Sequence, residues 1–430
     1  MKTYLIEARL EAPLALKRDR QSDRSETVRS IPGTTLRGAL ATVYLQQHGQ
    51  VDGTFRLLFM DEQRCRFGPL DPAPNTYPLT MAACKRHAED HPKVDQLAYR
   101  VALHLNHGKV REELHSQFRE CREPDCRAEL KAHVGFWYAH GDQLRDRTVE
   151  AQYVAAHVGI DRTTATAADG VFYTLEALSP DIARKGRNDG EPDLVGWVQA
   201  DSEAVEALRK LLAEEDGIVY LGHHRTRGYG RVHLAISESP NLSDHDADAW
   251  AAWSNRLIAF VQQTRDADAH GFAPAPPALD PSRDTLFAIS LPTGAILVDE
   301  LLRYTADLSQ MVHWLPRLPD PASLFPVEDR PTATFAQQGE LRCVAAVTNL
   351  QLLRGWNAAH GLPRQDEWMA ARGSVYVYWL RGTPDDRQQL FEALSRLANE
   401  GVGLRRNEGY GRVVANDPIH LDNLVPEANP

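Results

Sequence analysis

The apolar residues of this chain recur at helical and at strand spacing, and the two patterns predict the same unit twice. Asp201-Ser202 caps a helix whose apolar stripe covers residues 205–212. A second helix follows a cap at Thr383, with proline at its first position, and its stripe covers residues 390–397. Each helix ends at a glycine and leads through a short loop into a strand-like segment. The repeated unit is therefore helix, loop, strand.

Other segments predict further strands and a boundary between two halves. Residues 1–9, 285–291, 341–353 and 374–380 have the composition of strands. Helical spacing returns after Trp250. This helix lies between an acidic, turn-rich segment and a proline-rich connector. Such segments are typical of a linker, so the two halves of the chain are expected to meet in this region. The mixture of helices and strands indicates an α+β fold.

The two loops of the repeated unit are copies of one another. Residues 221–232 align without gaps on residues 402–413, and seven of the twelve positions are identical. Glycines permit tight turns, arginines supply forked donors, and a tyrosine offers a flat face to a nucleobase. This duplication predicts phosphate-binding loops in two related domains. A pair of glycine-bracketed hairpins with arginines in solvent is the alternative.

Composition limits the class of protein. The chain has 430 residues, of which 43% are hydrophobic and 25% charged, as in an ordinary two-domain globular protein. Without a long apolar segment or a signal peptide, and with five cysteines, it is expected to be cytoplasmic and to have no contact with a membrane. The net charge of −11 argues against indiscriminate coating of nucleic acid. Because basic residues gather in the two loops and between residues 15 and 41, the charge distribution favours either one defined RNA in one groove or a subunit that relies on its partners for positive charge.

A turn sequence opens the helix predicted near the N-terminus. Pro32-Gly33 forces a turn, Thr34 or Thr35 is expected to cap the helix, and Arg37 follows. The free amides of a helix N-terminus attract a phosphate. An ordinary capped amphipathic helix is the alternative.

These loops and this helix opening resemble the RAMP superfamily of CRISPR-associated proteins. Its members have ferredoxin-like (RRM-like) domains, and a glycine-rich loop before the last strand contacts guide RNA. The family's loop pattern is complete in residues 401–411, whereas the first copy has Tyr220 in place of the leading glycine. Residues 31–38 are similar to the family motif at the first helix. Residues 157–173 resemble the family's central element, which implies that Arg162 contacts the RNA backbone.

The resemblance implies an α+β fold with two tandem ferredoxin-like (RRM-like) RAMP domains. The first would cover residues 1–237, with a zinc-bearing insertion at about 62–135. Residues 238–283 would form a linker and connecting helix, and residues 284–430 the second domain.

Segments in both halves are similar to one branch, the RAMP protein of type III-D effector complexes (the Csx-ten family, a Cas-five-like subunit). They lie between Tyr77 and Cys126 and between Arg354 and Tyr376. The resemblance implies that the protein holds the 5′ repeat-derived handle of CRISPR RNA in antiviral defence. Its implied partners are a Cas-ten-like large subunit and Cas-seven-like backbone subunits, with target RNA contacted only indirectly. The residues expected to bind RNA are Arg18, Arg20, Arg24, Arg29, Thr34, Arg37, Arg162, Gly222, His223, His224, Arg225, Arg227, Tyr229, Arg231, Arg405, Arg406, Tyr410 and Arg412.

A cluster of cysteines and histidines is a candidate metal site. Cys121 and Cys126 have the spacing of zinc ligands, and Cys84 lies upstream with His87 or His91. The segment around them is polar and irregular, so a metal would substitute for a missing core. We favour a structural zinc held by Cys84, His91, Cys121 and Cys126, with unligated thiols as the alternative.

Two catalytic roles compete with a binding role. His223 and His224 are candidate general bases of a Cas-six-like repeat endonuclease. Asp19 and Asp23 are candidates for Cas-seven-like cleavage of target RNA. The branch of the family implies the non-catalytic role, in which the histidines donate to phosphate and the aspartates pair with nearby arginines. The chain is therefore predicted not to be an enzyme.

Overall fold

The computed structural model describes residues 1–16, 29–140, 143–147, 152–180, 191–238, 247–266, 278–299, 301–308, 333–334, 340–357 and 360–422. Helices and strands are mixed in these residues, and two sheets of five strands dominate, which confirms the α+β class. Among the described helices, none has the length and apolar character needed to span a membrane. The predicted domain boundaries stay a prediction.

The first sheet is antiparallel, with the spatial order β12–β13–β1–β11–β2. Its strands are β1 (Lys2–Leu10), β2 (Cys65–Asp71), β11 (Leu194–Ala200), β12 (Ile218–Tyr220) and β13 (Arg231–Glu238). Without the short β12, this is the strand order of a ferredoxin-like βαββαβ unit. Alternate residues of β1, such as Ile6 and Leu10, are buried together with Leu36 and Leu208 from the helices of this half. Those helices are α1 (Gly33–His48), α2 (Gly53–Phe59) and α6 (Ser202–Ala213).

The second sheet is also antiparallel and has the order β17–β18–β23–β14–β24. Its strands are β14 (Asp284–Leu291), β17 (Ala333–Thr334), β18 (Glu340–Val347), β23 (Ser374–Arg381) and β24 (Val414–Ala415). The strands from β18 to β24 repeat the order of the first sheet. Helix α9 (Pro384–Glu400) packs on one face, where Leu390 and Leu394 join Phe287 and Ile289 in one core.

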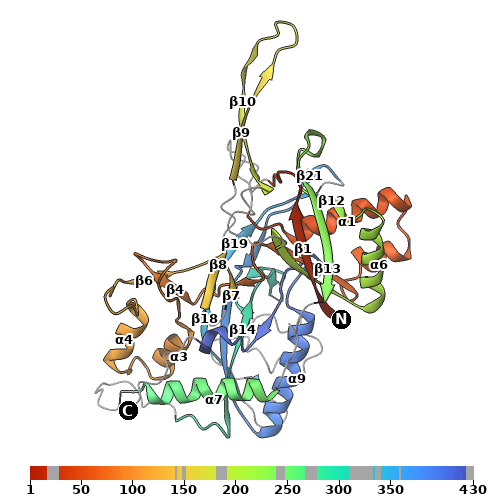
Figure 1. The fold of residues 1–430 in the computed structure, drawn as a ribbon. Helices are drawn as coiled ribbons and strands as arrows, with labels where there is room; N and C mark the ends of the chain where they lie inside the picture. The colour runs from red at the N-terminus through yellow and green to blue at the C-terminus, as the bar shows by residue number, and fades with distance from the viewer. Residues whose placement is uncertain are drawn as a thin grey trace.

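The remaining elements lie mostly between β2 and β11 and around the second sheet. Between β2 and β11 are β3 (Asn75–Thr76), β4 (Met81–Cys84), β5 (Val94–Asp95), α3 (Leu97–Leu105), α4 (Glu112–Arg119), β6 (Leu130–Ala132), β7 (Phe136–His140), β8 (Gln143–Arg147), β9 (Gln152–Ile160) and β10 (Ala167–Leu178). Elsewhere are α7 (Ala247–Gln263), β15 (Leu297–Val298), β16 (Tyr304–Thr305), β19 (Leu350–Leu353), β20 (Trp356–Asn357), β21 (Leu362–Pro363), β22 (Glu367–Ala370) and α10 (Ile419–Asp422). Figure 1 shows the β9–β10 hairpin projecting from the rest of the molecule.

The middle strands β14 and β23 of the second sheet are buried on both faces, and elements from the first half of the chain cover one of these faces. Every residue of β14 is buried. Leu286 and Ala288 point away from α9 into a core shared with Val101 of α3 and Leu257 of α7. Figure 1 shows α3 and α7 on this side of the molecule. The segment between β2 and β11 therefore completes the core of the second half.

The starts of two helices are confirmed and that of a third is corrected. Asp201 accepts a hydrogen bond from the Ala204 amide at 2.8 Å at the start of α6, and Thr383 and Asp386 form a capping box on α9. At α1, Pro32 occupies the N-cap and no side chain caps the helix, so the predicted threonine cap is wrong. The turn lies earlier than expected because Gly33, whose Cα packs against the carbonyls of Phe67 and Glu408, begins the helix.

A buried hydrogen-bonded chain connects the two halves. His420 of α10 lies between Asp95 of β5 and Ser290 of β14, with Nδ1 2.9 Å from the Asp95 carboxylate and Nε2 2.8 Å from the Ser290 hydroxyl. The His420 side chain is fully buried. Burial opposes the charged imidazolium, but the Asp95 carboxylate outweighs it, and the pKa of His420 is raised.

The raised pKa predicts a pH-dependent contribution to stability. A proton held more tightly in the folded state stabilises it fully below the unfolded pKa, about 6.5, and this contribution is lost as pH rises through the folded pKa. His420→Gln should therefore lower the free energy of unfolding by about 3 kcal/mol at pH 6 and by less at pH 9. Urea unfolding of both proteins at each pH measures the difference, with exposed His360→Gln as control. A difference that stays constant with pH would contradict the prediction.

Candidate functional site

The two glycine-rich loops have the same backbone conformation. Their glycines at 222, 228 and 230 have positive φ angles of 75°, 84° and 84°, and those at 403, 409 and 411 have 76°, 88° and 73°. His224 and Arg405, at aligned positions, are also left-handed, with φ of 62° and 58°. Each loop closes through one amide–carbonyl bond, from Leu221 to Gly230 at 2.8 Å and from Val402 to Gly411 at 2.7 Å.

Each loop is also held by the segment that follows the first strand of its own sheet. The His223 and Gly230 amides donate to carbonyls of residues 15 and 13, after β1. The Leu404 and Gly411 amides donate to carbonyls of residues 296 and 294, after β14. The repeat therefore includes the support of the loop as well as the loop itself.

The first loop presents its cations to solvent. Arg225 and Arg227 are exposed on a single 3-10 turn, and His223 beside them is exposed as well. Arg227 donates to the Tyr173 hydroxyl at 2.6 Å, and Arg225 donates to the Gly222 carbonyl of its own loop at 3.2 Å. Arg231 pairs with Glu11 at 2.9 Å. Arg225 and Arg227 are thus free of carboxylate partners among the contacts of the described residues, and they lie where a polyanion has access.

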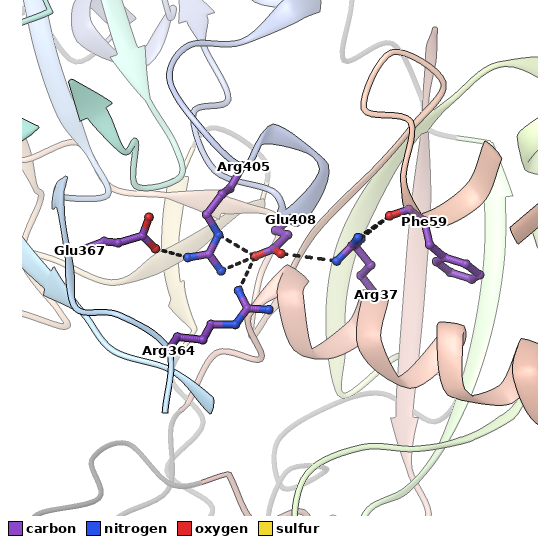
Figure 2. Close-up of polar contacts among 6 residues, drawn as sticks. All are labelled: Arg37, Phe59, Arg364, Glu367, Arg405 and Glu408. Carbon is purple, nitrogen blue, oxygen red and sulfur yellow. Dashed lines mark hydrogen bonds and ion pairs between the residues drawn. The ribbon is translucent and has the colours of Figure 1, made fainter. Parts of the chain in front are cut away.

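The second loop instead directs its side chains into the protein (Figure 2). Glu408, only 9% exposed, is the centre of the network. It accepts hydrogen bonds from Arg405 of the same loop at 2.9 Å and from Arg364 at 3.0 Å, and Arg37 of α1 lies 3.4 Å away. Arg405 also pairs with Glu367. Three guanidinium groups therefore converge on one carboxylate between the two halves of the chain.

The other basic residues of the second loop are engaged in the same way. Arg406 pairs with Glu62 and donates to the Glu400 carbonyl. The Arg412 guanidinium lies 5.0 Å from the centre of the Trp197 ring, and burial lowers the pKa of Arg412 to about 10. Burial likewise raises the pKa of Tyr410. The second loop thus contacts the first sheet and its helices.

The remaining predicted RNA-binding residues are dispersed. Arg37 lies against the second loop and donates to the Phe59 carbonyl at 2.9 Å, so it is not beside the first loop. Thr34 is half-buried in α1, and Arg29 is exposed just before it. Arg162 is exposed at the tip of the β9–β10 hairpin. Arg18, Arg20 and Arg24, together with the alternative catalytic residues Asp19 and Asp23, lie outside the described residues.

The structure brings together the four predicted metal ligands. One donor atom from each of Cys84, His91, Cys121 and Cys126 lies within 4.8 Å of all the others. The Cys84 and Cys126 sulfurs are 3.6 Å apart, and His91 Nδ1 is 3.1 Å from the Cys121 sulfur. Two thiolates about 2.3 Å from a tetrahedral zinc lie about 3.8 Å apart, so the spacing fits a metal centre.

His91, and not His87, supplies the fourth donor atom of this set. The His87 amide donates to the Cys84 sulfur at 3.4 Å, so His87 contacts the cluster through its backbone. Burial opposes the Cys84 thiolate, but the amides of His87 and Arg86 and the neighbouring thiols outweigh it, and the pKa of Cys84 falls to about 6. Burial raises the pKa of Cys121 to about 11. The cluster can hold a metal.

Sequence reasoning missed Glu408, although the signal was present. Glu408 aligns with Arg227, so the repeat reverses charge at this position. The seven identical positions describe what the two loops share. The reversed charge at this position corresponds to their different environments, one exposed to solvent and one within the protein. Arg364 and Glu367, on or beside the short strands β21 and β22, carry no comparable signal in the sequence.

Two sheets in ferredoxin-like strand order, each with a glycine-rich loop before its last strand, define an α+β protein of the RRM-like type. The model of the RAMP superfamily matches residues 13–233, which is half of the chain. The chain belongs to the RAMP superfamily. The comparison with curated proteins gives no match.

Similar solved structures are distant from this chain. A chain of the type III-B Cmr-beta complex bound to cognate target RNA is 11% identical, with a TM-score of 0.36, over 87% of this chain and 86% of that chain. Cmr4 from Pyrococcus furiosus is 15% identical, with a TM-score of 0.22, over 56% of this chain and 100% of its own. A chain of a type IV-B CRISPR complex is 11% identical, with a TM-score of 0.26, over 56% and 93%.

Proposed function

We propose that this protein is a CRISPR RNA-binding subunit of a type III effector complex. In this proposal it is the Cas-five-like (Csx-ten) subunit of a type III-D complex, it holds the 5′ repeat-derived handle, and it docks beside Cas-ten-like and Cas-seven-like subunits. Membership of the RAMP superfamily supports the class. The finer assignment is supported by the sequence segments that resemble that branch.

The proposed RNA-binding role rests on one observation. The two glycine-rich loops have the same backbone conformation but lie in different environments. The first loop offers Arg225 and Arg227 to solvent at the edge of its sheet, whereas the second has its own carboxylate, Glu408, among its arginines. Exposed guanidinium groups on a rigid, glycine-supported turn suit a phosphate backbone. The first loop is therefore the proposed contact with RNA, and the second joins the two halves of the protein.

A titration with labelled RNA tests this function. The protein should bind RNA that carries a repeat-derived 5′ handle more tightly than RNA of equal length with the handle scrambled. Its affinity should fall with salt, since phosphate contacts release counterions. Equal affinity for both RNAs would contradict handle recognition, and no binding at low salt would contradict the RNA-binding role altogether.

We further propose that the chain cuts no RNA by itself. His223 and His224 of the first loop are proposed to donate to phosphate, and neither glycine-rich loop carries a base, an acid and a lysine together. The labelled handle RNA and a guide-complementary RNA should stay intact on incubation with the protein, with or without magnesium. A discrete product that disappears in His224→Ala would favour a Cas-six-like nuclease, and one that disappears only in Asp23→Ala would favour a Cas-seven-like nuclease.

The metal we propose at the cysteine cluster is a structural zinc. Three thiols and one imidazole form a closed set of four ligands, which leaves no position for a catalytic water. Cys84 and Cys121 belong to the core shared by α3, α7 and the second sheet. Zinc here would stabilise the packing of the segment between β2 and β11 against the second half.

Metal content tests the zinc proposal. Purified protein should contain about one zinc per chain, because the four donors form one site. Cys126→Ala should abolish zinc binding and lower thermal stability, since metal-binding energy contributes to folding. Cys343→Ala, which changes an exposed cysteine outside the cluster, should retain the metal. Protein purified without chelator that contains no zinc would contradict the proposal.

A further inference from the structure

The β9–β10 hairpin carries aromatic residues on the face that is turned toward the first glycine-rich loop. In the antiparallel register, His157 pairs with Tyr173 and Tyr153 pairs with Ala177. Side chains alternate between the faces of a strand, so these four residues share one face. The His157 and Tyr173 rings stack with their centres 5.1 Å apart and their planes at 18°.

The first loop contacts this face directly. Tyr229 of the loop packs on Leu175 and Ala177, next to Ala15. The hydrogen bond from Arg227 to Tyr173 joins the tip of the loop to the stacked pair. Burial raises the pKa of Tyr229, the nearby Tyr153 raises it further, and the positive charge of Arg227 opposes the rise. Aromatic rings from two elements therefore gather beside the two exposed arginines.

The surface is accessible, and its composition differs between the two faces of the hairpin. Tyr153 is 44% exposed although it lies on the face that meets the loop. The opposite face carries Val154, Val158 and Phe172, which are 57%, 51% and 69% exposed. The face with Tyr153 and Tyr173 combines flat rings with the guanidinium groups of Arg225 and Arg227, which is the combination that binds unpaired nucleotides.

We propose that Tyr153, Tyr173 and Tyr229 form a stacking site for an unpaired nucleobase of the RNA whose phosphates contact Arg225 and Arg227. This inference rests on the proposed RNA-binding function and assigns a base subsite to it. A base stacks on an aromatic ring whatever its sequence, because every base has a π-face. The arginines then hold the phosphate backbone of the RNA, and the aromatic rings orient one base.

Removal of an exposed ring tests the subsite. Tyr153→Leu should weaken binding of the unstructured handle RNA about 5- to 100-fold and leave the salt dependence unchanged, because stacking involves no counterion release. Phe172→Leu removes a ring of equal size from the opposite face and should have no effect. Thermal unfolding checks that both variants remain folded.

A second measurement uses the wild-type protein. RNAs with one abasic ribose, placed at each position in turn, should show a loss of affinity of similar size at a single position. The RNA that is abasic at this position should bind Tyr153→Leu no more weakly than it binds the wild-type protein. RNA binding that depends on Arg225 and Arg227 but is unaffected by Tyr153→Leu and by every abasic position would overturn the stacking site alone. Failure of the wild type to bind RNA would overturn the proposed function and the site with it.

Discussion

Replacing Arg225 and Arg227 together by alanine should weaken handle RNA binding about 100-fold. Each exposed guanidinium is expected to make one charge-assisted contact to phosphate, worth about tenfold in affinity. The slope of log affinity against log salt should become shallower by about 1.4, since a single-stranded contact contributes about 0.7. Filter-binding titrations at several salt concentrations measure both quantities. The fold should persist because both side chains are exposed.

Arg209→Ala/Lys210→Ala is the matched control for that pair. These residues lie on α6 of the same half, with side chains 37% and 77% exposed, and their removal changes net charge by the same amount. Less than about a twofold loss of affinity is expected, because neither side chain lies on the loop and salt screens the field of exposed charges. If both double variants lose affinity equally, binding reflects net charge and the loop is not the site.

Glu408→Ala should cause a large loss of stability. It removes the carboxylate on which Arg37, Arg364 and Arg405 converge and leaves three guanidinium groups in mutual repulsion. Breaking a buried ion pair costs about 3–5 kcal/mol, and the lower value is expected because the arginine side chains keep 20–28% exposure. Urea unfolding measures the change.

Two comparisons make the Glu408 prediction specific. Glu129→Ala removes a carboxylate that is 74% exposed and should change stability by less than about 0.5 kcal/mol. Inorganic phosphate should restore part of the stability of Glu408→Ala, since an anion that binds the folded state stabilises it by mass action. A Glu408→Ala protein as stable as the wild type would show that the network does not hold the two halves together.

The sequence alone determined the features that depend on local interactions. Glycines at fixed spacing determine three left-handed positions in each loop, because few other residues adopt positive φ at low cost. The caps of α6 and α9 follow from adjacent side chains and amides. The three cysteine ligands were also predictable, since Cys121 and Cys126 have the spacing of zinc ligands and Cys84 lies upstream, whereas the sequence left His87 or His91 open as the fourth ligand. The domain division and the RNA-binding residues stay predictions.

Only the tertiary structure decided which copy of the loop faces solvent. Arg37 and Glu408 are 371 residues apart in the chain, and their pairing depends on how the two halves pack. The same holds for α3, which covers a sheet formed by the other half, and for His420, which meets Asp95 across 325 residues. The hydrophobic effect drives burial without specifying a partner, so no local pattern encodes these contacts. The repeated sequence determined that both loops have the same backbone conformation. The packing of the two halves left the first loop exposed and placed the second loop against other parts of the protein.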